Sequence, residues 1–102
     1  SATTCASDDI KIEHVNLVRE GLRGQYLTVV GTLFNSCDRP EGVKLHIVLQ
    51  DGDGQAISTS DPWPAGTQNI PPRSEYSFTI NAPAEYRPAK SLQVTVAEVM
   101  EW

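Results

Sequence analysis

The sequence predicts a small all-β protein built as a sandwich of two antiparallel sheets, and three observations support this class. The apolar residues of most segments recur at every second position, which is the period of a half-buried strand. Turn residues separate about six or seven such segments, and no window of helical length shows a 3.6-residue apolar period. With 102 residues, of which 39% are hydrophobic and 21% charged, the chain can form one core. A small barrel is the alternative fold.

The first two strands are predicted on either side of a turn at 21–24. The segment 10–13 alternates cleanly, but after His14 the apolar positions move one residue out of phase. This shift indicates a β-bulge near His14. The run YLTVVGTLFN at 26–35 is rich in β-branched and aromatic residues, and Asn35 is expected to end that strand and cap the loop after it.

The second half of the chain begins with the clearest half-buried strand, at 43–49, followed by a strong turn signal. We expect Asp51 to accept hydrogen bonds from the backbone of this turn and Gly54 to adopt a positive φ. The other expected elements are strands at 55–60, 76–80 and 92–96, and irregular connections at 36–42, 61–73 and 83–88. The predicted organisation is a polar N-terminal segment, 1–9, and a single sandwich domain, 10–102.

The two cysteines predict a disulfide between Cys5 and Cys37. An even cysteine count in a small domain is typical of an oxidising compartment, and a bridge of this span contributes roughly 3–4 kcal/mol in the chain-entropy model. Two free thiols in a cytosolic protein, or a lipid-modified Cys5, are the alternatives. There is no CxxC motif and no zinc-like spacing, so the cysteines favour neither redox catalysis nor metal binding.

The net charge of −5 and the pI of about 4.8 exclude several classes of partner. The eight basic residues are scattered, whereas nucleic acid and anionic membranes select clustered Lys and Arg. No apolar run reaches the roughly 20 residues of a membrane helix, so a membrane-spanning protein is not expected. The small polar start at 1–4 resembles a mature or trimmed N-terminus, from which an export signal would already have been removed. The expected location, periplasmic or secreted, rests on the two cysteines.

The segment 26–83 resembles the FxLYD domain family of bacterial β-sandwich modules. The resemblance rests on VGTLFN at 30–35, on IVLQD at 47–51 with its turn, and on IPP at 70–72 followed by Phe78. This sequence departs from the family pattern, with Ile47 for Phe, Gln50 for Tyr and Pro72-Arg73 for Pro-Gly. The resemblance implies an immunoglobulin-like sandwich of about seven strands in a cell-envelope or secreted protein, without shared catalytic residues.

No catalytic residue, metal site or cofactor is expected. The DGDG at 51–54 begins like a calcium loop, but the twelfth position is Pro62 instead of Glu, which favours a plain hairpin turn. His14 and His46 have no evident third ligand, so each is expected to be structural or solvent-exposed. Serine is abundant without a GxSxG elbow, and a scattered catalytic triad stays an open alternative.

Trp63 and Trp102 are the candidate binding residues. Trp63 lies between two prolines in the longest loop, where it is either a preorganised anchor or a cap on an open end of the sandwich. The same question applies to Trp102, the last residue of the sequence, which could also pack against a continuation of the chain. The expected function is a non-catalytic protein-interaction or assembly module. The alternative is a carbohydrate-binding module, with Trp63 and Tyr86 as stacking platforms.

Overall fold

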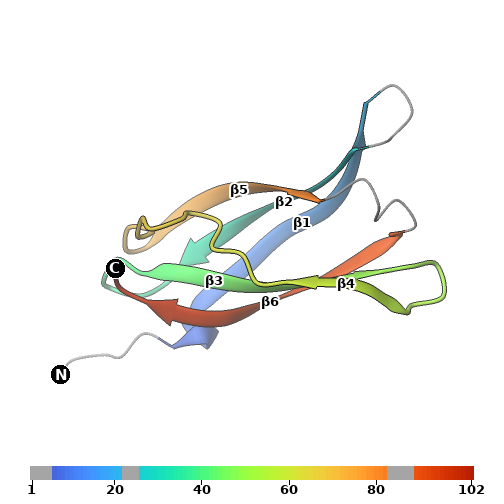
Figure 1. Ribbon diagram of the computed structural model, residues 1–102. Helices are drawn as coiled ribbons and strands as arrows, with labels where there is room; N and C mark the ends of the chain where they lie inside the picture. Colours follow the sequence, from blue (N-terminus) through green and yellow to red (C-terminus); the bar gives the residue numbers. More distant parts are fainter. Residues whose placement is uncertain (1–5, 22–25, 83–88) are drawn as a thin grey trace.

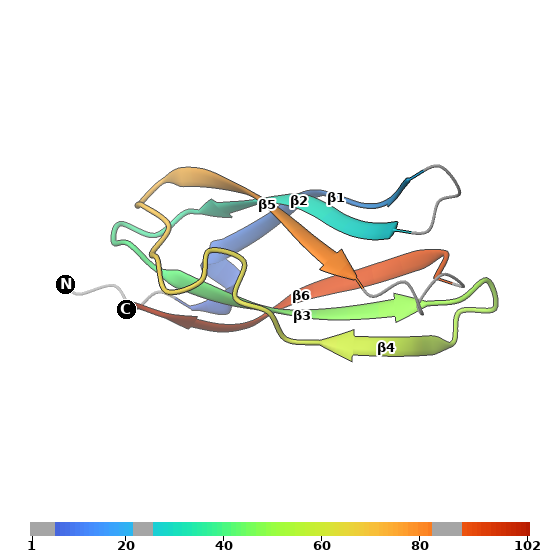
Figure 2. The same cartoon turned by 45° about the horizontal axis from the view of Figure 1, so that its top comes forward.

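The computed structural model describes residues 6–21, 26–82 and 89–102, which form two antiparallel sheets facing each other (Figures 1 and 2). The expected β-sandwich is therefore confirmed. A short 3-10 helix, η1 (Ser7–Asp9), precedes the strands. The strands are β1 (Ile10–Glu20), β2 (Tyr26–Asn35), β3 (Gly42–Gln50), β4 (Ala56–Ser60), β5 (Ser74–Ala82) and β6 (Ser91–Met100).

Each sheet has three strands, in the order β1-β2-β5 in one and β4-β3-β6 in the other. The strands β1, β2 and β5 take the places of strands A, B and E of an immunoglobulin domain, and β3 and β6 those of C and F. The described residues thus contain six strands instead of about seven. Residues 61–73 add only one isolated bridge, between Glu41 and Ile70, because their four prolines remove the N–H groups that a ladder needs.

The phase shift in β1 is a β-bulge, as predicted. Glu13 pairs with Thr32 and Asn16 with Val30, so β1 contains one extra residue, and His14 has a φ of 52°. The bulge returns the apolar positions to the inner face, since Ile12 and Leu17 both pack against the core.

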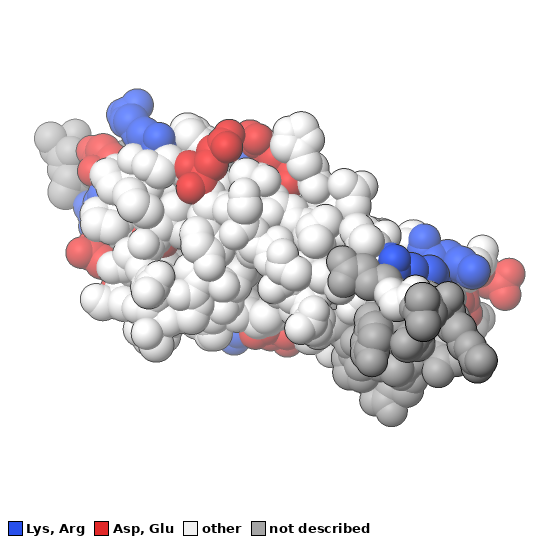
Figure 3. Space-filling model, turned by 90° about the horizontal axis from the view of Figure 1, so that it is seen from above, with Lys and Arg blue, Asp and Glu red and all other residues white. Residues whose placement is uncertain are grey.

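The core lies between the central strands β2 and β3. Its largest fully buried apolar side chains are Leu27, Val29, Leu33, Val43, Leu45, Ile47 and Ile70. Gly31 gives room to an aromatic ring, because a Cβ at this position would lie 2.8 Å from Cζ of Phe78. The outer face of the β1-β2-β5 sheet is mostly uncharged, with charged side chains near its borders (Figure 3).

The turn between β3 and β4 has the geometry that its sequence predicts. Oδ1 of Asp51 accepts hydrogen bonds from the backbone N–H groups of Asp53 and Gln55, at 2.9 and 3.0 Å. Gly54 has a φ of 81°, and its N–H donates to the Asp51 carbonyl. A carboxylate engaged in this way is a structural turn residue.

Asn35 has the predicted capping role and a larger one. Its side chain is fully buried, and its Oδ1 accepts the N–H of Cys37 at 2.9 Å. Its Nδ2 donates to the carbonyls of Arg39, Ile70 and Pro71, at 2.9, 3.0 and 3.3 Å. One side chain therefore joins the end of β2, the loop after it and the segment before β5.

Cys37 is 8% exposed in this loop. Cys5 lies outside the described residues, so the disulfide between them stays a prediction. The same is true of Tyr86 and of the connection at 83–88, while of the turn at 21–24 only Gly21, with a φ of 96°, is described.

Candidate functional site

The two candidate binding residues are in contact, although they are far apart in the sequence. The ring centroids of Trp63 and Trp102 lie 5.0 Å apart with an interplanar angle of 62°, which is an edge-to-face arrangement. Trp63 is half-buried, whereas Trp102 is 48% exposed and is the only large hydrophobic residue in the described part of the chain with that much exposure. Trp63 thus acts partly as a cap, and Trp102 presents aromatic surface to solvent.

The pairing of β6 with β3 positions Trp102. Met100 pairs with Gly42 at the end of this ladder, so the chain leaves β6 beside the start of β3. The indole lies over Gly42, where a Cβ would come within 2.4 Å of Nε1. The backbone N–H of Trp102 also donates to Oδ1 of Asn69 at 2.9 Å, which connects it to the loop that carries Trp63.

Three hydrogen bonds hold the loop around Trp63. The Pro62 carbonyl accepts the N–H of Leu45 at 2.9 Å, and the Pro64 carbonyl accepts the Tyr76 hydroxyl at 3.2 Å. The Trp63 carbonyl accepts the N–H of Gly66 at 2.9 Å. The backbone is therefore fixed on both sides of Trp63, to β3 through Pro62 and to β5 through Pro64.

Acidic groups lie close to the pair along the chain. Glu101 immediately precedes Trp102, and Asp61 lies two residues before Trp63. Oδ1 of Asp61 is 2.8 Å from Nδ1 of His46, and both side chains are about half exposed. This contact is a further tether between the Trp63 loop and β3.

Glu41 is a buried carboxyl next to Gly42. Its side chain is 6% exposed, and Oε1 lies 3.9 Å from Nε of Arg39. Burial raises the pKa of Glu41; Arg39 lowers it, and the nearby negative charge of Glu101 raises it further. Its backbone pairs with Ile70, so the carboxyl is held at the same end of the sandwich as Trp102.

The other candidate residues do not form a site. His14 is on β1 and His46 on β3, in different sheets. No group of three potential metal ligands occurs among the described residues. His46 and Asp61 resemble a base and its orienting group, yet no hydroxyl or thiol within the described ranges hydrogen-bonds the second ring nitrogen.

Sequence reasoning singled out both tryptophans but could not pair them, because their contact depends on the register of β6 against β3. It also missed Glu41 and Asn69. The only local signal for Glu41 was its place just before the cleanest strand, and the polar loop around Asn69 gave no signal for that residue.

Among the described residues, no helix has the length and apolar character needed to cross a membrane. No protein-family model matches the chain, and neither a curated protein nor a solved structure matches it.

Proposed function

We propose that this chain is a non-catalytic protein-interaction module of the FxLYD type, working in the bacterial envelope or as part of a secreted protein. Its contact surface is the end of the sandwich that carries Trp63 and Trp102. The observation that carries the proposal is the edge-to-face pair itself. Trp63 is half-buried, and Trp102, which contacts it, is 48% exposed.

Preorganisation favours binding at this surface. Interfaces concentrate their energy in a few aromatic or arginine residues, and ordering a flexible loop costs free energy. Here the loop is already held through Pro62, Pro64 and Asn69, and Trp102 is supported by Gly42. Little further ordering is needed when a partner covers the exposed indole.

The surrounding charges select a basic partner. Glu101 and Asp61 lie within two residues of the tryptophans in the sequence, and Glu41 precedes Gly42, over which the Trp102 indole lies. The basic group near them is Arg39, which pairs with Glu41, and the whole chain carries a net charge of −5. A Lys or Arg over an indole face gains cation–π attraction, and nearby carboxylates add to it. The partner is therefore a protein segment that places a basic side chain on Trp102.

The predicted disulfide belongs to this proposal. A covalent link between Cys5 and Cys37 suits an oxidising compartment, where an exposed aromatic surface meets envelope or extracellular proteins. Cys37 lies two residues from the Asn35 junction. The bridge would thus fasten the N-terminal segment to the same end of the sandwich as the tryptophans.

Site-specific photocrosslinking tests the surface. A benzophenone amino acid replaces Trp102 in one protein and Thr79, on the exposed side of β5, in the control. We expect a discrete crosslinked envelope protein from position 102 alone. Once purified, that protein should bind the wild type and lose at least tenfold affinity for Trp102→Ala. Glu101→Gln should weaken binding more than Asp53→Asn, which removes the same charge in the turn at the opposite end of β3.

Equal crosslinking from both positions, or unchanged affinity of Trp102→Ala, would contradict the assignment. Because Trp63 and Trp102 are the only tryptophans, their fluorescence also tests the carbohydrate alternative. A saturable response to a cell-wall or plant polysaccharide, with no protein partner captured, would replace the protein-binding proposal.

A further inference from the structure

The edge of β6 is poorly protected against pairing with another strand. It is the outer strand of its sheet, and the described residues place no strand on its free side, where strand G follows F in an immunoglobulin domain. Protected edges carry charges, prolines or bulges. From Ser91 to Val96, β6 has none of these, and its bulge comes only at Ala97.

The other edges are better protected. The edge of β1 is broken by the bulge at His14, and β4 has only five residues. The start of β5 is covered by the loop that Tyr76 hydrogen-bonds at Pro64. The edge of β6 is therefore the first candidate for pairing with an added strand.

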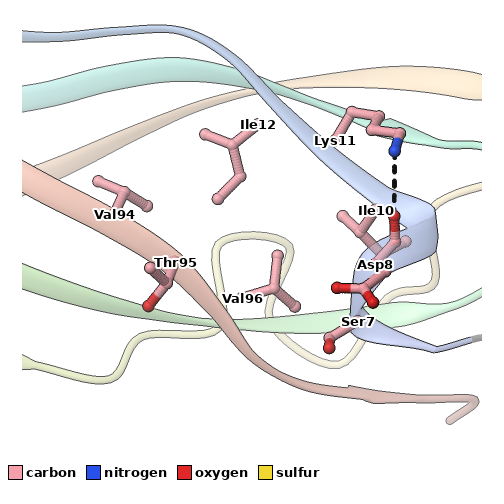
Figure 4. A pocket seen from close by; sticks show the side chains of 8 residues that line it. All are labelled: Ser7, Asp8, Ile10, Lys11, Ile12, Val94, Thr95 and Val96. Atoms are coloured by element: carbon pink, nitrogen blue, oxygen red, sulfur yellow. Dashed lines mark hydrogen bonds between the residues drawn. The ribbon is translucent and has the colours of Figure 1, made fainter.

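The seam between β6 and β1 is also incompletely closed. Leu45 and Ile47 of β3 are fully buried, while their partners on β6, Val96 and Val94, are only half-buried. A recess of about 400 Å³ lies here, lined by η1 and by parts of β1 and β6. Figure 4 shows Ile12 pointing from β1 toward β6, and Val94 and Val96 pointing back. A strand beside β6 would cover this apolar surface.

The two ends of the seam differ in charge. At one end, the Arg19 guanidinium donates to the Ala89 carbonyl, next to Lys90. At the other end, Asp8 lines the recess and Glu98 follows on β6. Two lysines also lie at this end: the Lys11 Nζ donates to the Asp8 backbone carbonyl, and Lys44 pairs with Glu98 in the β3–β6 ladder, so the carboxylates of Asp8, Asp9 and Glu98 stand beside two ammonium groups. A basic end and a mainly acidic end on one strand edge are self-complementary under a two-fold axis.

We propose that this edge is the contact between two copies of the chain. The two β6 strands pair antiparallel about a two-fold axis near Val94 and join the two three-stranded sheets into one sheet of six strands. In this register Leu92 lies opposite Val96 of the second copy, so apolar residues share the inner face. Gln93 lies opposite Thr95 on the outer face.

The same register brings unlike charges together at both ends. Lys90 lies within one residue of Glu98 of the second copy, because the bulge at Ala97 displaces Glu98 by one position. Long side chains reach such diagonal neighbours. A parallel pairing in register would instead place Glu98 of one copy beside Glu98 of the other, and the two negative charges would repel. The charges therefore favour the antiparallel dimer, and they favour a second copy over an unrelated strand.

A charge-reversal cycle measured by sedimentation tests the dimer. We expect a concentration-dependent monomer–dimer equilibrium in the wild type. Lys90→Glu and Glu98→Lys should each weaken dimerisation about tenfold, and the double variant should return to within about threefold of wild type. Arg73→Glu and Glu75→Lys make the same changes of net charge away from β6 and should have no effect.

Crosslinking tests the register. An equal mixture of Gln93→Cys and Thr95→Cys proteins should form a disulfide-linked dimer faster than either protein alone. A wild type that stays monomeric up to about 1 mM would overturn the proposal and leave the edge to a different protein. A double variant that fails to recover, or controls that weaken the dimer equally, would also overturn it. All variants should keep the wild-type circular dichroism, and they should share the wild-type melting temperature at a concentration where every protein is monomeric.

Discussion

Replacing Asn35 with Ala should cost a large part of the stability of this domain. The side chain is completely buried and takes part in four hydrogen bonds, one as acceptor and three as donor. Alanine leaves the N–H of Cys37 buried without its acceptor, and a buried unsatisfied group costs about 1–3 kcal/mol. The carbonyl of Ile70 still accepts a hydrogen bond from the N–H of Glu41 at 3.1 Å, so this carbonyl loses only one of its two partners.

The carbonyls of Arg39 and Pro71 are only partly buried, and losing their hydrogen bonds adds about 1 kcal/mol. The total is about 3 kcal/mol, against roughly 5–15 kcal/mol for a whole domain. With a urea m-value of about 1–3 kcal/mol/M, the unfolding midpoint should fall by roughly 1–3 M. Urea titration followed by tryptophan fluorescence and circular dichroism measures this shift.

Two further variants make the Asn35 prediction specific. Asn35→Asp should be worse than Asn35→Ala at pH 7, because a carboxylate would face three carbonyl oxygens, and it should recover in acid. Asn81→Ala, on the exposed side of β5, removes an amide with little burial and should change stability by less than about 0.5 kcal/mol. The reasoning fails if Asn35→Ala loses less than about 1 kcal/mol, or if Asp replaces Asn without loss.

Three further changes test other parts of the structure. Gly31→Ala should lower the free energy of unfolding in urea by about 1–3 kcal/mol, because its methyl group would lie 2.8 Å from the Phe78 ring; an unchanged free energy of unfolding would show that the ring moves freely. Burial raises the pKa of Glu41 above its ordinary 4.5, so the folded state binds its proton more tightly than the unfolded state and stability falls as pH rises through the folded pKa. Glu41→Gln should therefore be more stable than wild type at pH 7, with the gap closing near pH 4 in parallel urea titrations; a constant gap would contradict this. Reducing the predicted disulfide between Cys5 and Cys37 should cost roughly 3–4 kcal/mol, and no change on adding dithiothreitol would refute the bond.

Local sequence signals predicted the local features of this fold. The bulge at His14, the Asp51 turn and the Asn35 cap each depend on a few neighbouring residues. Their side-chain types and the alternation of apolar positions can be read directly from the sequence. The strand at 26–35 was predicted at its observed bounds because β-branched and aromatic residues are concentrated in it.

Long-range features escaped prediction for a physical reason. The contact of Trp63 with Trp102 requires that β6 pair with β3 in one register, which no local pattern determines. The seam at β6 emerges only when the half-burial of Val94 and Val96 is compared with their partners on β3.

The bulge in β1 confines one extra residue to a single position of the strand. Ile12 and Leu17 face the same core only because the bulge at His14 absorbs one residue between them. Deleting His14 would remove the bulge and the extra residue together, so Glu13 and Asn16 would keep Thr32 and Val30 as partners in a regular ladder and Leu17 would still face the core. Polar substitution of the exposed His14, and even its deletion, should therefore be tolerated, because neither changes which side chains of β1 face inward.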